Sequence, residues 1–309
     1  MNWMKKLIAL LCCLLMLPAV YAEEAAPAPL LELHQMALEY ADGYYLRVGD
    51  VEIMIDGGKK VPFSKDDRVL ECLRALGAKE LDVYIVTHWH MDHCENVNPV
   101  LAEFGTAETL VFSPSAQVPA TVNDGKKNKR TLEITPLANG VYQQMKQGDV
   151  ITVGPLTISC IGPANGGRYG RTNPDSLNFV LQYGSRRMLF TGDFAASGNI
   201  NKVYKELCSN VDVLKFPHHG SPPYQIGDVA IQTTNPEYIL MPSDLHNIQV
   251  YRFVHGNGCD TKQENILSMK EGHVVILTDG GDYLEARTQQ NPADYAPKDN
   301  GSSDGAAGR

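Results

Sequence analysis

The sequence predicts an α/β protein in which two β-sheets pack face to face with helices on their outer sides. Strand-like runs outnumber helical ones, and the few helical stretches are inserted between strands, an order that suits this architecture. The 309 residues are 43% apolar, which is enough for a large core or two smaller ones. This composition excludes a disordered, collagen-like or low-complexity protein.

The first half of the chain begins with strands and continues with helices. Apolar residues at helical spacing and β-rich runs bounded by turn residues define these elements. We expect strands over 31–38, 43–48, 51–56 and 81–88, separated at Asp42-Gly43 and Gly49-Asp50 where turns occur, and helices over 66–76 and 95–104. The polar stretch 113–148 is interpreted as an excursion over the surface.

The second half is predicted to consist mainly of strands joined by tight turns. The expected strands are 150–153, 155–162, 176–184, 185–192, 211–216, 236–241, 273–279 and 282–287, with a helix over 202–208. Neither an internal repeat nor a coiled-coil heptad is found.

The two ends of the chain differ from this body. Residues 1–22 combine Lys5 and Lys6, an apolar run and the small-residue site Ala19-Val20-Tyr21-Ala22, which predicts a secretory signal peptide. An uncleaved membrane anchor is the alternative, although the run is short for a span. We interpret 23–30 as a linker, 31–287 as one hydrolase domain and 288–309 as a disordered tail. The mature protein is therefore expected outside the cytoplasm, without a stable membrane span.

Charge limits the binding partners. The formal net charge of −9 argues against broad, sequence-independent binding of nucleic acid, whereas a local basic patch stays possible. The sequence does not indicate an oligomeric state.

The most informative segment is Thr87-His88-Trp89-His90-Met91-Asp92-His93, which directly follows a predicted buried strand. Loops held by such strands commonly carry functional residues. Imidazoles bind zinc, iron or manganese, and a carboxylate supplies a hard anionic oxygen. Four such side chains within six residues predict a loop that serves two adjacent metal ions.

Two further segments place similar side chains at the ends of apolar strands. LFTGD ends on Asp193, and LKFPHHGS contains His218 and His219. Each alone has an ordinary explanation, since Asp193 suits a turn or helix cap and a histidine pair suits a polar turn. Their occurrence together with the first segment favours metal binding.

These three motifs, with IDGG at 55–58, resemble the metallo-β-lactamase superfamily. The longer phrases NPDSLNFVLQYGSRRMLFTGD and VDVLKFPHHGS are similar to its competence-protein branch, the ComEC-type metal-hydrolase domain. The resemblance covers about 31–287 and implies an αββα sandwich with a dinuclear site at one sheet edge. It also implies a ligand set in which His88 and His90 hold one metal, Asp92 and His93 the other, and Asp193 bridges them.

The resemblance does not decide which histidine of the pair is a ligand, and the sequence departs from the family pattern at two places. It implies that His219 completes the second site and that His218 faces substrate or acts as acid/base, with the reverse assignment as the alternative. Asp56 and Thr87 would support the ligands from behind. No histidine lies between His93 and His218, so the first site is poor in nitrogen. This would loosen the site or favour manganese over zinc, and both ions are kept as candidates. Glu95-Asn96 replaces the usual Gly-Gly, which could crowd the site.

The chemistry implied is hydrolysis by a hydroxide shared by two divalent ions. Asp92 would help to orient the water, and His218 would protonate a leaving oxygen. We assign substrate binding to Arg168, Arg171, Ser176 and Ser221. The two arginines, on a glycine-rich loop, suit a phosphate group, with an ordinary solvated loop as the alternative. The leading hypothesis is an exported phosphodiesterase or nuclease-like enzyme. Hydrolysis of another ester, such as a cell-wall phosphoester, lactone or β-lactam, and a catalytically weak binding protein are the alternatives.

Overall fold

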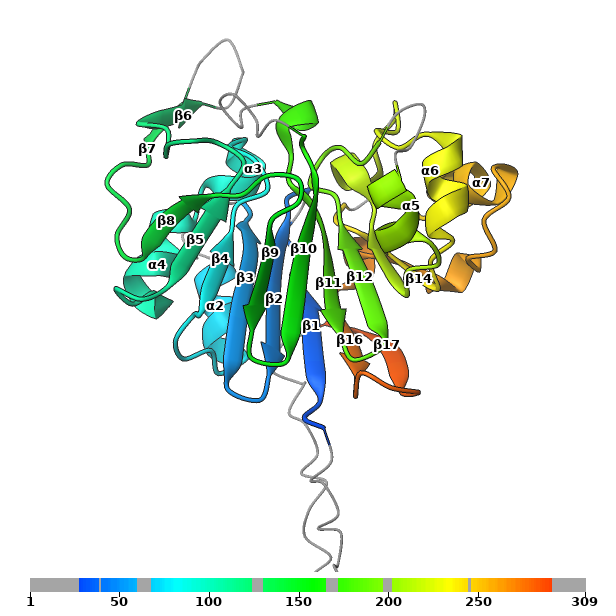
Figure 1. The fold of residues 1–309 in the computed structure, drawn as a ribbon, viewed down its shortest axis with the longest axis horizontal. Coiled ribbons are helices and arrows are strands. Elements are labelled where there is room, and N and C mark those ends of the chain that lie inside the picture. The colour runs from blue at the N-terminus through cyan, green and yellow to red at the C-terminus, as the bar shows by residue number, and fades with distance from the viewer. Residues whose placement is uncertain are drawn as a thin grey trace, which may run out of the picture.

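Two β-sheets packed face to face, with helices on both outer sides, form the body of the protein (Figure 1). The computed structural model describes residues 28–38, 40–59, 68–123, 130–164, 172–196, 202–243 and 246–290. The predicted α/β class and the layered arrangement of two sheets with helices outside are confirmed.

The first sheet has eight strands in the order β17-β16-β1-β2-β3-β4-β5-β8. It is antiparallel from β17 to β3 and parallel from β3 to β8. The strands are β1 (Leu31–Gln35), β2 (Gly43–Val48), β3 (Val51–Gly57), β4 (Val83–Ile85), β5 (Leu110–Ser113), β8 (Val141–Gln144), β16 (His273–Thr278) and β17 (Leu284–Gln289).

The second sheet has seven strands in the order β15-β14-β13-β12-β11-β10-β9. Its β12–β15 half is parallel and its β9–β12 half antiparallel. The strands are β9 (Val150–Val153), β10 (Leu156–Gly162), β11 (Asn178–Tyr183), β12 (Arg186–Phe190), β13 (Val213–Lys215), β14 (Tyr238–Met241) and β15 (Ile266–Ser268). A separate two-stranded sheet pairs β6 (Thr121–Asn123) with β7 (Thr131–Glu133).

Helices cover the outer faces of both sheets (Figure 1). One apolar cluster joins the first sheet to α2 and α4, and another joins the second sheet to α5, α6 and α7. The helices are α2 (Arg68–Ala75), α3 (Met91–Cys94), α4 (Val97–Phe104), α5 (Lys202–Cys208), α6 (Asp228–Thr234) and α7 (Ile248–Gly256), with short 3-10 turns η1 (Asn173–Asp175), η2 (Pro217–Gly220), η3 (Gln263–Asn265) and η4 (Met269–Glu271).

Strand β1 illustrates why the sheets are buried on both sides. Alternate residues of a strand face opposite sides of its sheet. Leu31 and Leu33 belong to the core between the two sheets, so Glu32 and His34 face outward toward the helices. All five β1 residues are nevertheless buried, because the α2 layer covers that side. The polar outward residues therefore need partners inside the protein.

Several element predictions are corrected by the structure. The stretch 113–148 is only partly an excursion, because β8 joins the first sheet beside β5. The helix predicted over 95–104 is confirmed as α4, whereas part of the preceding histidine-rich segment, expected to be a loop, forms the short helix α3. Prediction missed β5, β15, α6 and α7, whose short or mixed apolar patterns do not separate strand from helix.

The ends of the domain also differ in part from the sequence expectation. Strand β17 continues to Gln289 and pairs with β16, so the first residues of the predicted tail belong to the first sheet. The predicted signal peptide 1–22, most of the linker and residues 291–309 lie outside the described residues. Among the described helices, none has both the length and the apolar character needed to cross a membrane.

Candidate metal centre

The predicted ligand loops meet at one edge of the sandwich because of the strand directions. Strands β3 and β4 are parallel, as are β12 and β13, and residues that follow parallel strands gather at one edge, where α/β proteins bind ligands. Strand β2 is antiparallel to β3. Its first residues therefore lie at the edge where β3 ends, and this brings Asp42 into the site.

The loop after β4 delivers its imidazoles close together. His88 Nε2 lies 2.9 Å from His90 Nδ1, and the rings of His88 and His93 have centroids 4.1 Å apart. His88 and His93 are fully buried, whereas His90 is only partly buried. Helix α3 begins at Met91, so Asp92 and His93 project from its first turn.

Asp193 lies between the two halves of the cluster. Its Oδ1 is 3.1 Å from His93 Nε2, and its Oδ2 is 3.7 Å from His88 Nε2. The backbone N–H of Asp193 donates to Ser176 Oγ at 3.1 Å. The preceding Gly192 has φ +51°, and an added Cβ would lie 2.8 Å from the Ser176 Cβ and 3.0 Å from the Thr87 Cβ. Only glycine fits this turn without displacing the neighbouring loops.

The histidine pair occupies a strained turn after β13. His218 and His219 both have left-handed backbone angles, with φ of 53° and 55°, which non-glycine residues rarely adopt. The turn directs the buried His219 ring inward: its Nε2 is 3.3 Å from Asp92 Oδ2 and 3.8 Å from Asp193 Oδ1. His218 remains only partly buried.

Two charged residues that the sequence interpretation did not assign complete the site. Asp42 Oδ1 lies 3.1 Å from His219 Nδ1, and Asp42 Oδ2 forms an ion pair with Lys215 Nζ. Lys215 is 1% exposed, donates to the Gly192 carbonyl at 2.5 Å and lies 3.8 Å from Asp193 Oδ1. A lysine in an otherwise apolar strand was the available signal, because a buried lysine requires a partner.

Asp56 and Thr87 fix the His93 ring from the side that faces away from Asp193. Asp56 accepts hydrogen bonds from the Thr87 backbone N–H and hydroxyl, both at 2.7 Å. Its Oδ2 lies 2.8 Å from His93 Nδ1. An acceptor at Nδ1 fixes the ring orientation, so that Nε2 is the nitrogen that faces Asp193 and is available to a metal ion.

The charged side chains of the cluster shift one another's pKa values. Burial alone would favour the neutral ring of His219, but the carboxylates of Asp193 and Asp42 raise its pKa to about 9. Burial likewise opposes charge on His93, yet the same kind of carboxylate contact raises its pKa well above the usual value. Burial and the neighbouring His93 hold the pKa of His88 well below its usual value. In the metal-free protein, protons on His93 and His219 thus balance buried carboxylates, whereas His88 stays neutral.

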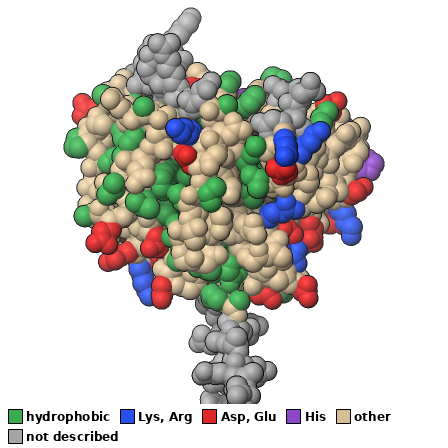
Figure 2. Space-filling view, viewed as in Figure 1, with side chains coloured by type: hydrophobic (Ala, Val, Ile, Leu, Met, Phe, Trp, Pro, Cys, Tyr) green, Lys and Arg blue, Asp and Glu red, His purple; other side chains and the backbone are tan. Residues whose placement is uncertain are grey.

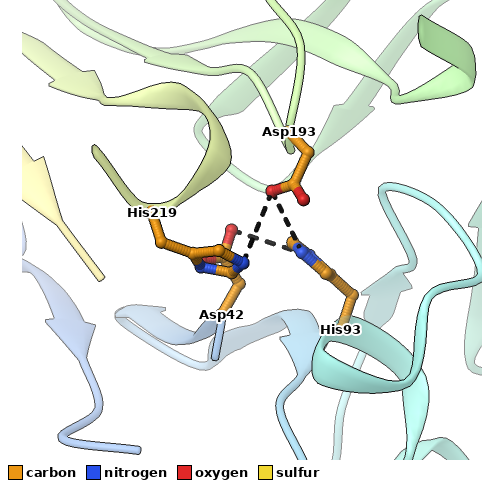
Figure 3. Close-up of side chains that lie close together, drawn as sticks. All are labelled: Asp42, His93, Asp193 and His219. Carbon is orange, nitrogen blue, oxygen red and sulfur yellow. Dashed lines mark hydrogen bonds and ion pairs between the residues drawn. The ribbon is translucent and has the colours of Figure 1, made fainter. Parts of the chain in front are cut away.

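The donor set fits divalent metal ions. His93 Nε2, His219 Nε2 and Asp193 Oδ1 are buried. Apart from the ion-pair contacts within the cluster, they have no hydrogen-bond partner among the described residues, although buried polar atoms normally have partners. These three atoms converge on one point from three segments of the chain (Figure 3). A second group, His88, His90 and Asp193, shares the same carboxylate. The structure therefore contains a possible metal-binding cluster of nitrogen and oxygen donors.

Asp42 plays a different part from the other members of this cluster. It lies close enough to be counted with His93, Asp193 and His219, but its two oxygens already contact His219 Nδ1 and Lys215 Nζ. We therefore place Asp42 behind His219, as Asp56 stands behind His93.

Of the residues predicted to bind substrate, the two serines lie near the metal centre, and the two arginines are not among the described residues. Ser176 is fully buried against Asp193, so contact with a substrate would require the loop to open. Ser221 directly follows the histidine turn, and its Oγ has no partner among the described residues. Arg168 and Arg171 lie outside the described residues. Glu95 pairs with Arg130, and Asn96 Nδ2 donates to the Gly57 carbonyl, so both side chains have structural partners.

A family model and a curated relative match much of the chain. A family model described as the metallo-beta-lactamase superfamily matches residues 38–233. The sequence is 27% identical over 234 residues to ComE operon protein 3 of Bacillus subtilis (strain 168), covering 74% of this chain and 27% of that protein. The chain thus spans about a quarter of this relative's length.

Solved structures with similar folds are also found. The metallo-beta-lactamase fold protein YhfI from Bacillus subtilis is 15% identical with a TM-score of 0.45, covering 73% of this chain and 93% of that one. A diphosphatase from the PhnP family is 11% identical with a TM-score of 0.44, covering 72% and 91%.

Proposed function

Because the chain belongs to the metallo-β-lactamase superfamily, we propose that it is a metal-dependent phosphodiesterase of nucleic-acid-like or other phosphodiester substrates, exported from the cytoplasm. We further propose that it uses two divalent ions, zinc or manganese. Export rests on the signal-like sequence of residues 1–22. The resemblance of NPDSLNFVLQYGSRRMLFTGD and VDVLKFPHHGS to the ComEC-type branch supports the choice of a phosphodiester over a lactone or β-lactam.

The position of Asp193 carries this proposal. One oxygen faces His93 and His219, the other faces His88, so a single carboxylate serves both donor groups. That arrangement is the one expected of a bridging ligand between two ions. When bound, such a pair supplies Lewis acidity and makes water reactive at neutral pH.

Other residues of the chain would orient the ligands, position the attacking water and transfer a proton to the leaving oxygen. Asp56 and Asp42 fix the orientation of the His93 and His219 rings through their Nδ1 atoms, and fixed ligands lose little entropy on binding. Asp92 has about a third of its side chain exposed and can accept a hydrogen bond from the attacking water. His218, at the rim of the site, can hold or deliver a proton at the leaving oxygen.

Surface charge favours a short substrate. On the face shown in Figure 2, basic side chains of the described residues stand among acidic ones, and the net charge is −9. Long duplexes are bound mainly through many phosphate contacts with lysine and arginine. A dinucleotide, a single-stranded end or a small phosphodiester requires few such contacts.

The proposal predicts metal-dependent turnover of phosphodiesters. The purified protein should hydrolyse bis(p-nitrophenyl) phosphate and single-stranded DNA after addition of zinc or manganese, and should lose this activity in excess chelator. A chromogenic β-lactam assayed in parallel should not be cleaved. Turnover of the β-lactam alone would overturn the choice of substrate, and absence of both bound metal and turnover would leave a binding protein.

The two adjacent histidines should respond differently to substitution. We expect His219→Gln to lower bound metal together with activity, since its Nε2 faces Asp92 and Asp193. His218→Gln should retain the metal and lower kcat by about 10²–10⁴-fold, the usual contribution of a general acid or base. Elemental analysis and kcat measured on both variants check this assignment. Loss of metal in His218→Gln with retention in His219→Gln would reverse it.

A further inference from the structure

An aromatic side chain that no step above uses lies against the metal centre. Tyr40 belongs to the loop between β1 and β2, two positions before Asp42. Its ring lies 5.0 Å from the His219 ring, centroid to centroid, with 39° between the two planes. His219 is buried, whereas Tyr40 is only partly buried. Tyr40 therefore lies at the boundary between the buried donors and solvent.

The loop holds Tyr40 in a backbone conformation that aromatic residues rarely adopt. Its φ is +67°, in the left-handed region that disfavours residues with a Cβ. The loop is anchored on both sides: the Leu38 N–H donates to Met269 Sδ at 3.3 Å, and the Asp42 N–H donates to the Asp92 carbonyl at 3.0 Å. Residues held in this way are common at ligand-binding sites. The anchored loop thus presents the ring at a fixed place.

A lysine accompanies this ring. Lys59, two residues after the end of β3, is partly buried, and its Nζ lies over the Tyr40 ring, 5.9 Å from the centroid. This distance is at the outer limit of a cation–π contact, which stabilises little where the side chains are partly exposed. A phosphate oxygen is a stronger partner for an ammonium group, because it carries a negative charge. The lysine can therefore leave the ring for a phosphate.

The pair of side chains matches the two chemical parts of a nucleotide. Bases stack on aromatic side chains with little regard to their identity, and lysine binds the phosphates that connect them. The metal centre receives the scissile phosphate of a phosphodiester, so a ring beside His219 is placed for the base of an adjoining nucleotide. A phosphodiester that carries no base would gain nothing from this ring.

From this arrangement we propose that Tyr40 and Lys59 form a nucleotide-binding subsite beside the metal centre. The base next to the scissile phosphate stacks on the Tyr40 ring, and Lys59 pairs with a neighbouring phosphate. This inference rests on the proposed phosphodiesterase function and narrows it to substrates that contain a nucleobase. Neither side chain is a metal ligand or a proton donor here, since both act by binding substrate.

Two chromogenic esters that differ in the nucleoside test the stacking partner. We compare the p-nitrophenyl ester of thymidine monophosphate with methyl p-nitrophenyl phosphate. Tyr40→Leu should lower the ratio of their kcat/KM values by about 5–150-fold, the range expected when one base loses an aromatic partner. Tyr40→Phe should keep the ratio. Tyr283→Leu, at an exposed tyrosine in the turn between β16 and β17, is the matched control and should also keep it.

Metal content separates substrate binding from support of the His219 ring. Leucine still covers His219 but offers no aromatic face, so Tyr40→Leu should retain the metal found in the unsubstituted protein by elemental analysis. Loss of metal in this variant would contradict the subsite, because Tyr40 would then act through His219.

Binding without turnover separates the subsite from the proposed function. Fluorescence anisotropy of a dye-labelled thymidine tetranucleotide in chelator should show weaker binding to Tyr40→Leu. Lys59→Met should reduce the slope of log affinity against log salt by about 0.7, whereas Lys202→Met, at an exposed lysine, should not change it.

The outcomes divide as follows between the two hypotheses. Tyr40-dependent binding of a tetranucleotide that is never hydrolysed would overturn the phosphodiesterase and keep the subsite. Hydrolysis with the same ratio of kcat/KM values in Tyr40→Leu as in the unsubstituted protein would overturn the subsite and keep the phosphodiesterase. Absence of both binding and hydrolysis would overturn both.

Discussion

Asp193→Ala is expected to abolish hydrolysis and most metal binding without unfolding the protein. Asp193 contributes one oxygen to each group of donors, so its removal weakens both at once. Lewis-acid stabilisation of a transition state is worth several kcal/mol. A loss of about 4 kcal/mol corresponds to about 10³-fold in rate.

The fold should survive because the partners of Asp193 can become neutral. His93 and His219 owe part of their raised pKa to this carboxylate. Without it, they can release a proton instead of remaining as unpaired buried charges. The cost is then that of leaving buried polar atoms without their partner, about 1–3 kcal/mol.

Metal content, kcat and melting temperature measured together test this expectation. The unsubstituted protein should melt higher with metal than with chelator, because an ion that binds only the folded state stabilises it. Asp193→Ala should show no such difference, whereas Asp282→Ala, which removes an exposed carboxylate, should behave as the unsubstituted protein. Unchanged rates in Asp193→Ala would remove this residue from the site.

Lys215→Met is expected to destabilise the protein by about 3–5 kcal/mol, the usual cost of removing one partner of a buried ion pair. Lys215 and Asp42 are each at most 1% exposed and pair with each other. Burial raises the pKa of Asp42, but Lys215, followed by His93 and His219, holds it below the usual value. Without Lys215, the carboxylate loses its strongest compensating charge.

The double variant Asp42→Asn with Lys215→Met separates charge from packing. If the cost of Lys215→Met comes from the unpaired carboxylate, a neutral asparagine at position 42 should restore most of the lost stability. Denaturant unfolding in chelator measures the free energy of unfolding of both variants. Lys202→Met, at an exposed lysine, should change it by less than about 0.5 kcal/mol. An additive double variant would contradict the charge explanation.

The sequence predicted the fold class and the donor residues because both depend on local patterns. Alternating apolar residues marked most strands, and THWHMDH concentrates four donors on one loop. Element boundaries were less secure, since helix α3 begins within the predicted histidine-rich loop and β8 has only one partly buried side chain, Tyr142. A short edge strand with little apolar content does not differ from a polar loop in sequence.

Asp42 and Lys215 had no assigned role in the sequence interpretation for a related reason. Asp42-Gly43 has the form of an ordinary turn, and Lys215 is one charged residue within an apolar strand. Their functional meaning comes from a contact between residues 173 positions apart, which no spacing rule encodes.

By itself, the sequence determined which side chains are available for metal chemistry and that they follow buried strands. Only the tertiary structure decided that His219 rather than His218 faces Asp193, that Asp42 and Lys215 stand behind the ligands, and that Tyr40 lies against His219. The physical reason is that side-chain type is a property of one position. Orientation and partnership depend on backbone turns and on sheets that join distant parts of the chain.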